Sequence, residues 1–144
     1  MIIVKHTNEL RPNELIEIFK QRVAVFVVEQ NCPYQEVDAD DFDDLHVCLM
    51  ENNKLKAYTR IIDKSDHITF GRVLVVKEYR KDGLGRQIVQ ATLDEIKRRF
   101  PDQSIQIQAQ AYLQKFYESF GFKAISTVYL EDNIPHLDML LENN

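Results

Sequence analysis

The 144-residue sequence is poor in residues that interrupt a fold, since it contains only four glycines and four prolines. It has no low-complexity stretch and no internal repeat, and nothing in its composition marks a linker between two domains. Its length fits one domain of ordinary size. A hydrophobic content of 44% is enough for a buried core. We therefore predict a single domain over residues 1–144.

Long apolar runs are also missing. No segment approaches the roughly 20 residues that are needed to cross a bilayer. The opening residues, MIIVKHTNEL, lack the basic region and the apolar stretch of a secretory signal. We therefore predict a cytoplasmic protein that has no membrane partner.

Positive charge is in the minority. Lys and Arg number 18 against 23 Asp and Glu, which gives a net charge of −5 at pH 7. Phosphate backbones are bound by basic surfaces, so we do not expect nucleic acid as a partner. A compact anionic cofactor is still compatible with this charge, because a local group of backbone N–H donors can hold it.

Cysteine is scarce, and its spacing is uninformative. Cys32 and Cys48 form neither a CxxC pair nor a wider framework, which argues against a disulfide scaffold or a metal site. We expect two buried or half-buried free thiols and no metal. Nucleophilic catalysis by cysteine would need a positioned histidine. His46 lies two residues from Cys48, but no third, orienting group is evident.

Hydrophobic periodicity predicts strands that alternate with helices. Helices are predicted after Pro12, over residues 84–99 and over residues 113–120. Strands are predicted at residues 2–5, 46–50, 55–62, 67–76, 104–110, 122–130 and 136–141, the last two as an antiparallel pair. The order β-α-β-β-β-α-β-α-β-β places the chain in the α/β class, as a central mixed sheet flanked by helices.

Two of these strands carry further information. Residues 67–76 end in a continuous apolar run, which indicates a central strand. In residues 104–110, Gln106, Gln108 and Gln110 alternate with apolar residues and so share one face. A polar face on a central strand indicates a solvent-filled cleft, with Gln108 and Gln110 toward the end where ligands gather.

Residues 29–44 are rich in acidic side chains and contain no basic one. The stretch is longer than most loops of a compact domain, and such loops are often functional. Its aspartates could attract a cationic amine or a lysine-bearing peptide. The commoner alternative is a solvated loop, and we favour that alternative. The aspartates concerned are Asp38, Asp40, Asp41, Asp43 and Asp44.

The strongest local signal is RKDGLGR, residues 80–86, which joins the apolar strand to the second long helix. Gly83 and Gly85 allow the backbone to approach a ligand closely. The free N–H groups at the start of the helix favour an anion at the same place. A pyrophosphate would fit, with added charge from Arg80, Lys81 and Arg86. The motif is neither GxxxxGK[ST] nor GxGxxG, and a tight turn whose glycines only allow packing would also explain it.

The pattern R-x-x-G-x-G after VLVV resembles the coenzyme A signature of the GNAT acyltransferases, Q/R-x-x-G-x-G/A. A second resemblance is FYESFGF, residues 116–122, where a helix carries an aromatic residue before a Gly-Phe turn. The segments VFVVEQNCPYQEVD and YLEDNIPH look like the ElaA-like branch of that family. The resemblance covers nearly the whole chain. It implies the GNAT fold and an N-acetyltransferase that moves an acetyl group from acetyl-CoA to a primary amine by direct attack in a ternary complex.

The resemblance also implies roles for single residues. Tyr117 would be the general acid toward the leaving thiolate, although packing against its apolar neighbours would explain it without chemistry. A backbone N–H near the end of the apolar strand could stabilise the oxyanion. Gln110 and Leu113 stand where many family members have an Asn and a small residue, which affects the contact to pantetheine. The implied coenzyme A contacts are Val73, Leu74, Val75, Arg80, Lys81, Asp82, Gly83, Leu84, Gly85, Arg86, Gln110, Leu113 and Phe116.

The general base is not identified by the pattern. Some family members place a carboxylate or a histidine before the cofactor loop, where this chain has Thr69, Gly71 and Arg72. Candidate bases are Glu29, His46 and His136, or a water chain to bulk solvent. Each histidine could equally be structural. The expected substrate contacts are Glu29, His46, Arg72, Gln108 and His136.

Two function classes stay open at this stage. The first is the transferase, whose acceptor is a small-molecule or peptide amine. The second is a non-catalytic acyl-CoA-binding or sensor module on the same fold. A weaker third idea is a phosphate-binding regulatory domain. In each case the C-terminal strands could form a homodimer.

Overall fold

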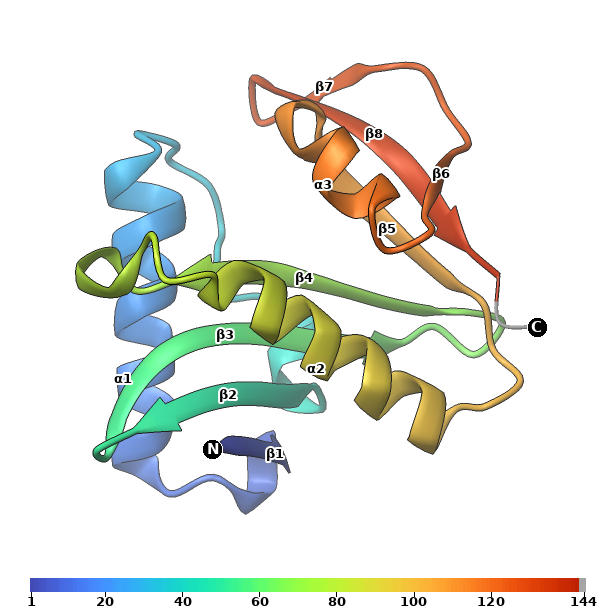
Figure 1. The fold of residues 1–144 in the computed structure, drawn as a ribbon. Helices are drawn as coiled ribbons and strands as arrows, with labels where there is room; N and C mark the ends of the chain where they lie inside the picture. The colour runs from blue at the N-terminus through green and yellow to red at the C-terminus, as the bar shows by residue number, and fades with distance from the viewer. Residues whose placement is uncertain (143–144) are drawn as a thin grey trace.

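A computed structural model describes residues 1–142, in which helices lie on both faces of a mixed sheet (Figure 1). The strand order is β1-β2-β3-β4-β5-β8-β6, and β7 also pairs with β8. The strands are β1 (Ile2–His6), β2 (Leu45–Glu51), β3 (Lys54–Asp63), β4 (Ile68–Val75), β5 (Ile105–Gln110), β6 (Lys123–Ala124), β7 (Tyr129–Glu131) and β8 (Ile134–Leu141). The α-helices are α1 (Pro12–Val23), α2 (Leu84–Arg99) and α3 (Gln114–Glu118). The predicted fold class is confirmed.

Apolar side chains form one cluster on each face of the sheet. On the face covered by α2, Ile88 and Ile96 pack with Ile61 of β3. On the face covered by α1, Ile18 packs with Tyr58 of β3. Each fully buried aliphatic side chain contributes about 1.5–3 kcal/mol relative to an exposed one. These two clusters therefore fix both helices against β3 and β4.

The β2–β3 hairpin turns at the predicted dipeptide. Asn52 and Asn53 have positive φ values of 53° and 61°. A two-residue hairpin loop of this kind requires positive φ at both central residues, and Asn accepts that conformation more readily than most residues. The hairpin brings Arg60 and Tyr58 of β3 beside β4.

β4 is the central strand, as predicted, but it diverges from its parallel neighbour. It pairs with β3 along most of its length, whereas Ile68 with Ile105 is the only pair between β4 and β5 within residues 1–142. The Ile68 N–H donates to the carbonyl of Ser104 at 2.9 Å. Beyond this point the two strands separate (Figure 1). The sheet is thus two parts joined at one end, with an edge of β4 open toward β5.

β4 also contains a bulge, beyond the point where it separates from β5. Leu74 pairs with Tyr58 and Gly71 pairs with Arg60, so two residues of β4 face one residue of β3. Arg72, one of the two, has a φ of 52°. This conformation costs a non-glycine residue about 1–3 kcal/mol and persists where surrounding contacts enforce it. The bulge redirects the strand at residues 72–73, just before it continues to Val75.

Two predicted elements differ in the structure. The first helix ends as an α-helix at Val23 and continues as a π-helix, η2 (Ala24–Glu29). The single strand predicted at residues 122–130 is wrong, because it is split into β6 and β7. Between them the Ser126 hydroxyl accepts the Asp138 N–H at 2.8 Å, and the Ile125 N–H donates to the Asp138 carbonyl at 2.9 Å. A side chain thus replaces a backbone partner of β8 and interrupts the ladder.

The acidic stretch is folded around buried arginines, so the prediction of a solvated loop is wrong for most of it. Arg22 is fully buried; its guanidinium donates to the Glu36 carboxylate at 3.0 Å and to Asp41 at 2.7 Å. Arg60 donates to both oxygens of Asp38, at 2.8 and 2.9 Å. Asp38 and Asp41 are therefore not free to attract an amine, because arginines already neutralise them.

Three aspartates of the stretch are in other surroundings. Asp44 is buried, and its nearest cation is the Arg60 guanidinium at 3.4 Å. Asp40 lies 4.0 Å from the ammonium of Lys64, and Asp43 is exposed.

The two buried aspartates of the stretch have opposite pKa shifts. Burial, together with the nearby Asp41, raises the pKa of the Asp44 carboxyl to about 7. Burial would also raise the pKa of Asp41, but the hydrogen bonds from Arg22 and from the Asp38 backbone prevail and lower it to about 2.

Both cysteine thiols are free and buried, as predicted. Over the described chain, no helix is both long enough and apolar enough to cross a bilayer. Nor do residues 1–142 bring three or more His, Cys, Asp or Glu side chains together in a way that could hold a metal ion.

Candidate functional site

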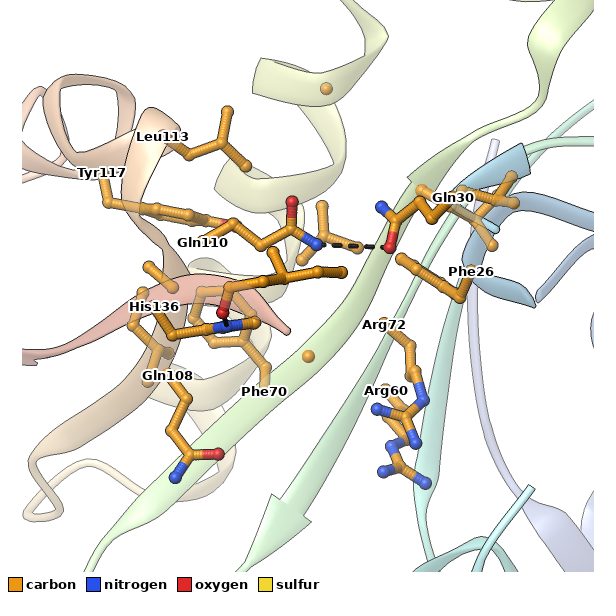
Figure 2. A pocket seen from close by; sticks show the side chains of 18 of the residues that line it. Phe26, Gln30, Arg60, Phe70, Arg72, Gln108, Gln110, Leu113, Tyr117 and His136 are labelled. Atoms are coloured by element: carbon orange, nitrogen blue, oxygen red, sulfur yellow. Dashed lines mark hydrogen bonds between the residues drawn. The ribbon is translucent and has the colours of Figure 1, made fainter. Parts of the chain in front are cut away.

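A cavity of about 970 Å³ opens where β4 and β5 separate (Figure 2). Residues 69–75 of β4 and 107–110 of β5 line its two sides. The start of α2, α3 with the turn before it, η2 and the β7–β8 turn also contribute to the wall, together with residues from 32–40 and from the end of β3. The divergence of the two strands therefore creates the site, and every surrounding element contributes side chains to it.

The N-terminus of α2 opens into this cavity. Gly83 is the N-cap residue with a φ of 74°, a conformation that favours glycine. The first backbone hydrogen bond of the helix joins the Gln87 N–H to the Gly83 carbonyl at 3.2 Å. The amides of residues 84–86 precede that bond and have no helical acceptor. Such amides and the positive end of the helix dipole make an anion site.

Gly85 is not explained by packing within the protein. It is the second residue of α2 and does not have a positive φ, so its backbone conformation does not require glycine. A Cβ built at this position would meet only the Val75 side chain, at an ordinary contact distance of 3.9 Å. Space for a larger residue therefore exists on the cavity side. The absence of a side chain fits close approach of a ligand to the backbone, so the residues present suit a bound diphosphate.

Basic side chains at this end of the cavity are held in place by the protein. Arg80 donates to the Glu29 carboxylate at 2.6 and 2.9 Å and to the Val75 carbonyl at 3.0 Å. The hydrogen bonds that Glu29 accepts from Arg80 lower the pKa of its carboxyl. Arg86 donates to the Ser119 hydroxyl at 2.8 Å and lies over the Phe120 ring. Glu29 lines the cavity, but its carboxylate is occupied by Arg80.

Tyr117 is both packed and accessible. Tyr117 is 5% exposed. Its ring packs against the rings of Phe70, Phe116 and Phe122, with centroids 5.1–6.3 Å apart. Within residues 1–142 the hydroxyl has no hydrogen-bond partner, yet it is not among the polar atoms sealed from solvent. The oxygen is therefore reached through the cavity. Burial raises the pKa of Tyr117, so the hydroxyl stays protonated at neutral pH.

The opposite half of the cavity is polar. Gln110 of β5 and His136 of β8 are direct partners in an antiparallel pair, so their side chains share one face. The Gln110 side-chain amide reaches Gln30 across the cavity at 3.5 Å (Figure 2). Gln108 also lines this half and is exposed. Gln108 and Gln110 of the predicted glutamine face therefore line an open cleft, whereas Gln106 is not one of the cavity-lining residues.

Arg72 lines the cavity but is tied to the acidic stretch. Its guanidinium lies 2.5 Å from the Glu36 carboxylate and donates to the Glu36 carbonyl at 2.8 Å. It also lies over the ring of Tyr34. Figure 2 shows Arg72 and Arg60 side by side on the wall opposite Tyr117. Arg72 is therefore a fixed part of the wall, because its guanidinium is already paired with Glu36.

Two residues expected at the site lie outside the cavity. His46 is fully buried and contacts the Thr7 hydroxyl at 2.7 Å and the Tyr58 hydroxyl at 2.6 Å. Burial lowers the pKa of its imidazole to about 4. Asp82 is exposed and is not one of the cavity-lining residues. Neither side chain is placed to meet a ligand in the cavity.

The cavity brings the other expected residues together. They are Val73, Leu74, Val75, Arg80, Lys81, Gly83, Leu84, Gly85, Arg86, Gln108, Gln110, Leu113, Phe116, Tyr117, Glu29, Arg72 and His136. The structure adds Phe26, Gln30 and Tyr34, which sequence reasoning missed. For Gln30 and Tyr34 the only signal was the unusual length of residues 29–44, which selects no single residue. Phe26 continues the apolar pattern of the first helix, so the sequence marked it for packing alone.

Residues 13–143 match the family described as acetyltransferase (GNAT) domain. The chain belongs to the GNAT family. It is 42% identical over 142 residues to the protein ElaA of Escherichia coli K12. The aligned region covers 95% of this chain and 93% of that protein. The predicted family and its ElaA-like branch are thus confirmed.

Solved GNAT structures agree with this assignment. The crystal structure of Escherichia coli ElaA has a TM-score of 0.93 and 41% identity, with 99% of both chains covered. An acyl-CoA N-acyltransferase from Pseudomonas aeruginosa has a TM-score of 0.92 and 39% identity, covering 97% of this chain and 98% of that one. An aminoglycoside 6′-N-acetyltransferase complexed with coenzyme A has a TM-score of 0.73 at 14% identity, covering 99% and 97%, which is a likeness of fold.

Proposed function

We propose that this chain transfers an acetyl group from acetyl-CoA to a primary amine of a small molecule or peptide, with both substrates bound at once. Membership of the GNAT acyltransferase family supports the reaction class. The observation that carries the proposal is the composition of the cavity. The open amides of α2, the free edge of β4 and the Tyr117 hydroxyl all face one space.

Coenzyme A fits the α2 end of that space. Its diphosphate would meet the amides of residues 84–86, with Lys81 and Arg86 nearby. Gly85 leaves room for this approach. The pantetheine arm would lie along residues 73–75, whose edge toward β5 has no strand partner within the described chain. Exposed backbone groups of this kind pair with a ligand or with water.

The chain supplies the proton and the dipoles for the reaction. Acetyl-CoA, when bound, supplies an activated acyl carbon on a thiol leaving group. A backbone N–H of residues 73–75 would stabilise negative charge on the carbonyl oxygen. Tyr117 would donate its proton to the sulfur as the C–S bond breaks, and the amide nitrogen would release the proton that restores the tyrosine. The protonated state of Tyr117 at neutral pH suits this role.

The alternative is an acyl-CoA-binding or sensor module that does not turn over. Two features favour the transferase. A protein that only binds the cofactor has no need for a tyrosine hydroxyl without a partner. Such a protein also has no need for a polar half of the cavity beyond the place where the thioester would lie. Gln108 and His136 line that half here. A cytoplasmic location and a homodimer through the C-terminal strands stay predictions.

The decisive experiment measures thiol release from acetyl-CoA over a panel of primary amines. Tyr117→Phe should lower kcat by roughly ten- to ten-thousand-fold, because the proton donor is lost. The affinity for coenzyme A, measured by calorimetry, should stay near the wild-type value. The matched control is Tyr79→Phe, since Tyr79 lies outside the cavity and contacts Lys56.

The outcomes separate the hypotheses. An unchanged rate for Tyr117→Phe removes this residue from the mechanism. Coenzyme A binding without turnover of any amine supports the sensor. If the folded chain binds no coenzyme A, the cofactor assignment itself is wrong.

A further inference from the structure

We propose that His136 is the general base that accepts the proton of the acceptor amine through Nε2. The proposal rests on the transferase function above and names a residue that the sequence left undecided. His136 lies on β8 and faces the polar half of the cavity, beside Gln110 (Figure 2). An incoming amine would meet its ring there, on the side of the cavity that is lined by the glutamines of β5.

The hydrogen bonds of His136 fix its tautomer. Nδ1 lies 2.7 Å from the carbonyl oxygen of Ile134. A carbonyl oxygen only accepts, so Nδ1 carries the hydrogen in the neutral ring. The lone pair is therefore on Nε2. Within residues 1–142, Nε2 has no hydrogen-bond partner, which leaves it available for a ligand.

The ring is also held from the side. Tyr129 of β7 stacks on it, with centroids 6.3 Å apart and planes 22° from parallel. The Tyr129 hydroxyl donates to the Asp138 carboxylate at 2.5 Å, which anchors the stacking partner. His136 is thus fixed by one backbone contact and one ring contact. A base with a fixed orientation is effective because its geometry is set before the substrate arrives.

Other titratable groups near His136 are less suited to the role. Glu131 and Asp132 line the same end of the cavity but are exposed on the β7–β8 turn. Asp138 is occupied by Tyr129. Cys32 and Asp38 line the far wall of the cavity, and the carboxylate of Asp38 is paired with Arg60. Glu29 is paired with Arg80 at the other end. Among these groups, only His136 combines a directed, unpartnered lone pair with a place in the wall.

The proton balance is simple. An ammonium N–H of the acceptor gives its proton to Nε2, and the neutral amine nitrogen then forms the bond to the acyl carbon. The imidazolium passes its proton to water at the open mouth of the cavity. Tyr117 supplies the separate proton that the leaving sulfur takes. Acid and base thus come from two elements, α3 and β8, on the same half of the sheet.

The test compares His136→Asn with wild type on two amines. The Asn side-chain amide can still donate to the Ile134 carbonyl, but it offers no base. The probes are the fastest primary amine of the panel and its weakly basic β,β,β-trifluorinated analogue. We expect kcat/KM to fall about 100-fold or more with the strongly basic amine. With the analogue, which is already neutral, the loss should be less than about 10-fold.

Controls keep the result specific. His67→Gln is the matched control, since His67 lies outside the cavity beside Asp66. Thermal unfolding and coenzyme A affinity establish that each variant is folded and loaded. If His136→Asn does not fold, His136→Gln is used in its place.

Three results would overturn the assignment. An equal loss with both amines indicates a structural role for His136, and an unchanged rate with both removes it from the mechanism. In either case wild-type turnover leaves the transferase function intact. A wild-type chain that binds coenzyme A but acetylates no amine overturns the proposed function, and the base assignment fails with it.

Discussion

The two walls of the cavity are built from different interactions. The wall formed by β3, the β4 bulge and residues 29–44 is held by ion pairs, with the fully buried Arg22 at its centre. The wall formed by α3 and the following turn is held by aromatic packing, in which Phe122 meets Phe70 and Tyr117 at 6.0–6.1 Å. Both walls position groups that face the same space.

The two walls differ in their interactions because they differ in regular secondary structure. Residues 29–44 have little regular structure, with one 3₁₀ turn, η3 (Ala39–Phe42), so few backbone hydrogen bonds fix them. Directional charge-assisted bonds from arginines can order such a segment. On the other wall a helix and strands already fix the backbone, and ring packing fills the space between them. The first wall should therefore respond to pH and to loss of a partner, whereas the second should respond to volume.

The largest effect is expected from Arg22→Met. The substitution keeps an apolar stem but removes the fully buried guanidinium that pairs with both Glu36 and Asp41. The two buried carboxylates then retain only the more peripheral Arg72 and Arg60 as cations. We expect the free energy of unfolding to fall by about 3–5 kcal/mol, measured by urea denaturation. The control is Arg98→Met, where an exposed pair with Glu95 should cost about 0–1 kcal/mol. Equal losses for the two variants would contradict the distinction between the walls.

A pH-dependent effect is expected from Asp44→Asn. The pKa of Asp44 is raised to about 7 in the folded chain, against about 3.9 when unfolded. The folded state therefore binds this proton more tightly, so its stabilisation is complete below about pH 4 and is lost as pH rises through about 7. Asn does not titrate. The stability of the variant relative to wild type should rise by on the order of 4 kcal/mol between pH 4 and pH 8. Parallel urea midpoints over that range would refute this.

The smallest effect is expected from Phe122→Leu on the aromatic wall. The side chain is 2% exposed and packs edge-on against Phe70 and Tyr117. Loss of part of its volume should lower the free energy of unfolding by about 1 kcal/mol. The loss should not change between pH 4 and pH 8 or with added salt, because no charge is involved. A salt-dependent difference would show that the two walls are coupled.

The fold was largely predictable because its signals are local. The periodicity of residues 84–99, the Asn52–Asn53 turn and the apolar run in β4 each fix one element without reference to distant residues. The split between β6 and β7 was not predictable, because it depends on a contact between Ser126 and a strand twelve residues away. The π-helical extension of α1 also lacked a signal, since residues 24–29 continue the apolar pattern of the helix.

The site was predictable where the backbone defines it. Gly83 and Gly85 mark the α2 end, and the Gly-Phe turn marks Tyr117. Side chains that depend on pairing were not predictable. The arginine partners of Asp38 and Asp41 lie 22 and 19 residues away in the chain, so the acidic run resembled a solvated loop. His46 and His136 could not be told apart by sequence, because burial alone separates them.

The single pair that joins β4 to β5 has a geometric consequence for the acyl group. From Ile68 to Val75 the strand extends about 23 Å. A rotation of about 5° between the strands at Ile68 would move the Val75 end by about 2 Å and the Thr69 end hardly at all. Side chains packed around Ile68 and Ile105, remote from any ligand, therefore set the width of the opening at the far end. Repacking that remote corner offers a way to admit longer or bulkier acyl chains without altering a single residue that would touch them.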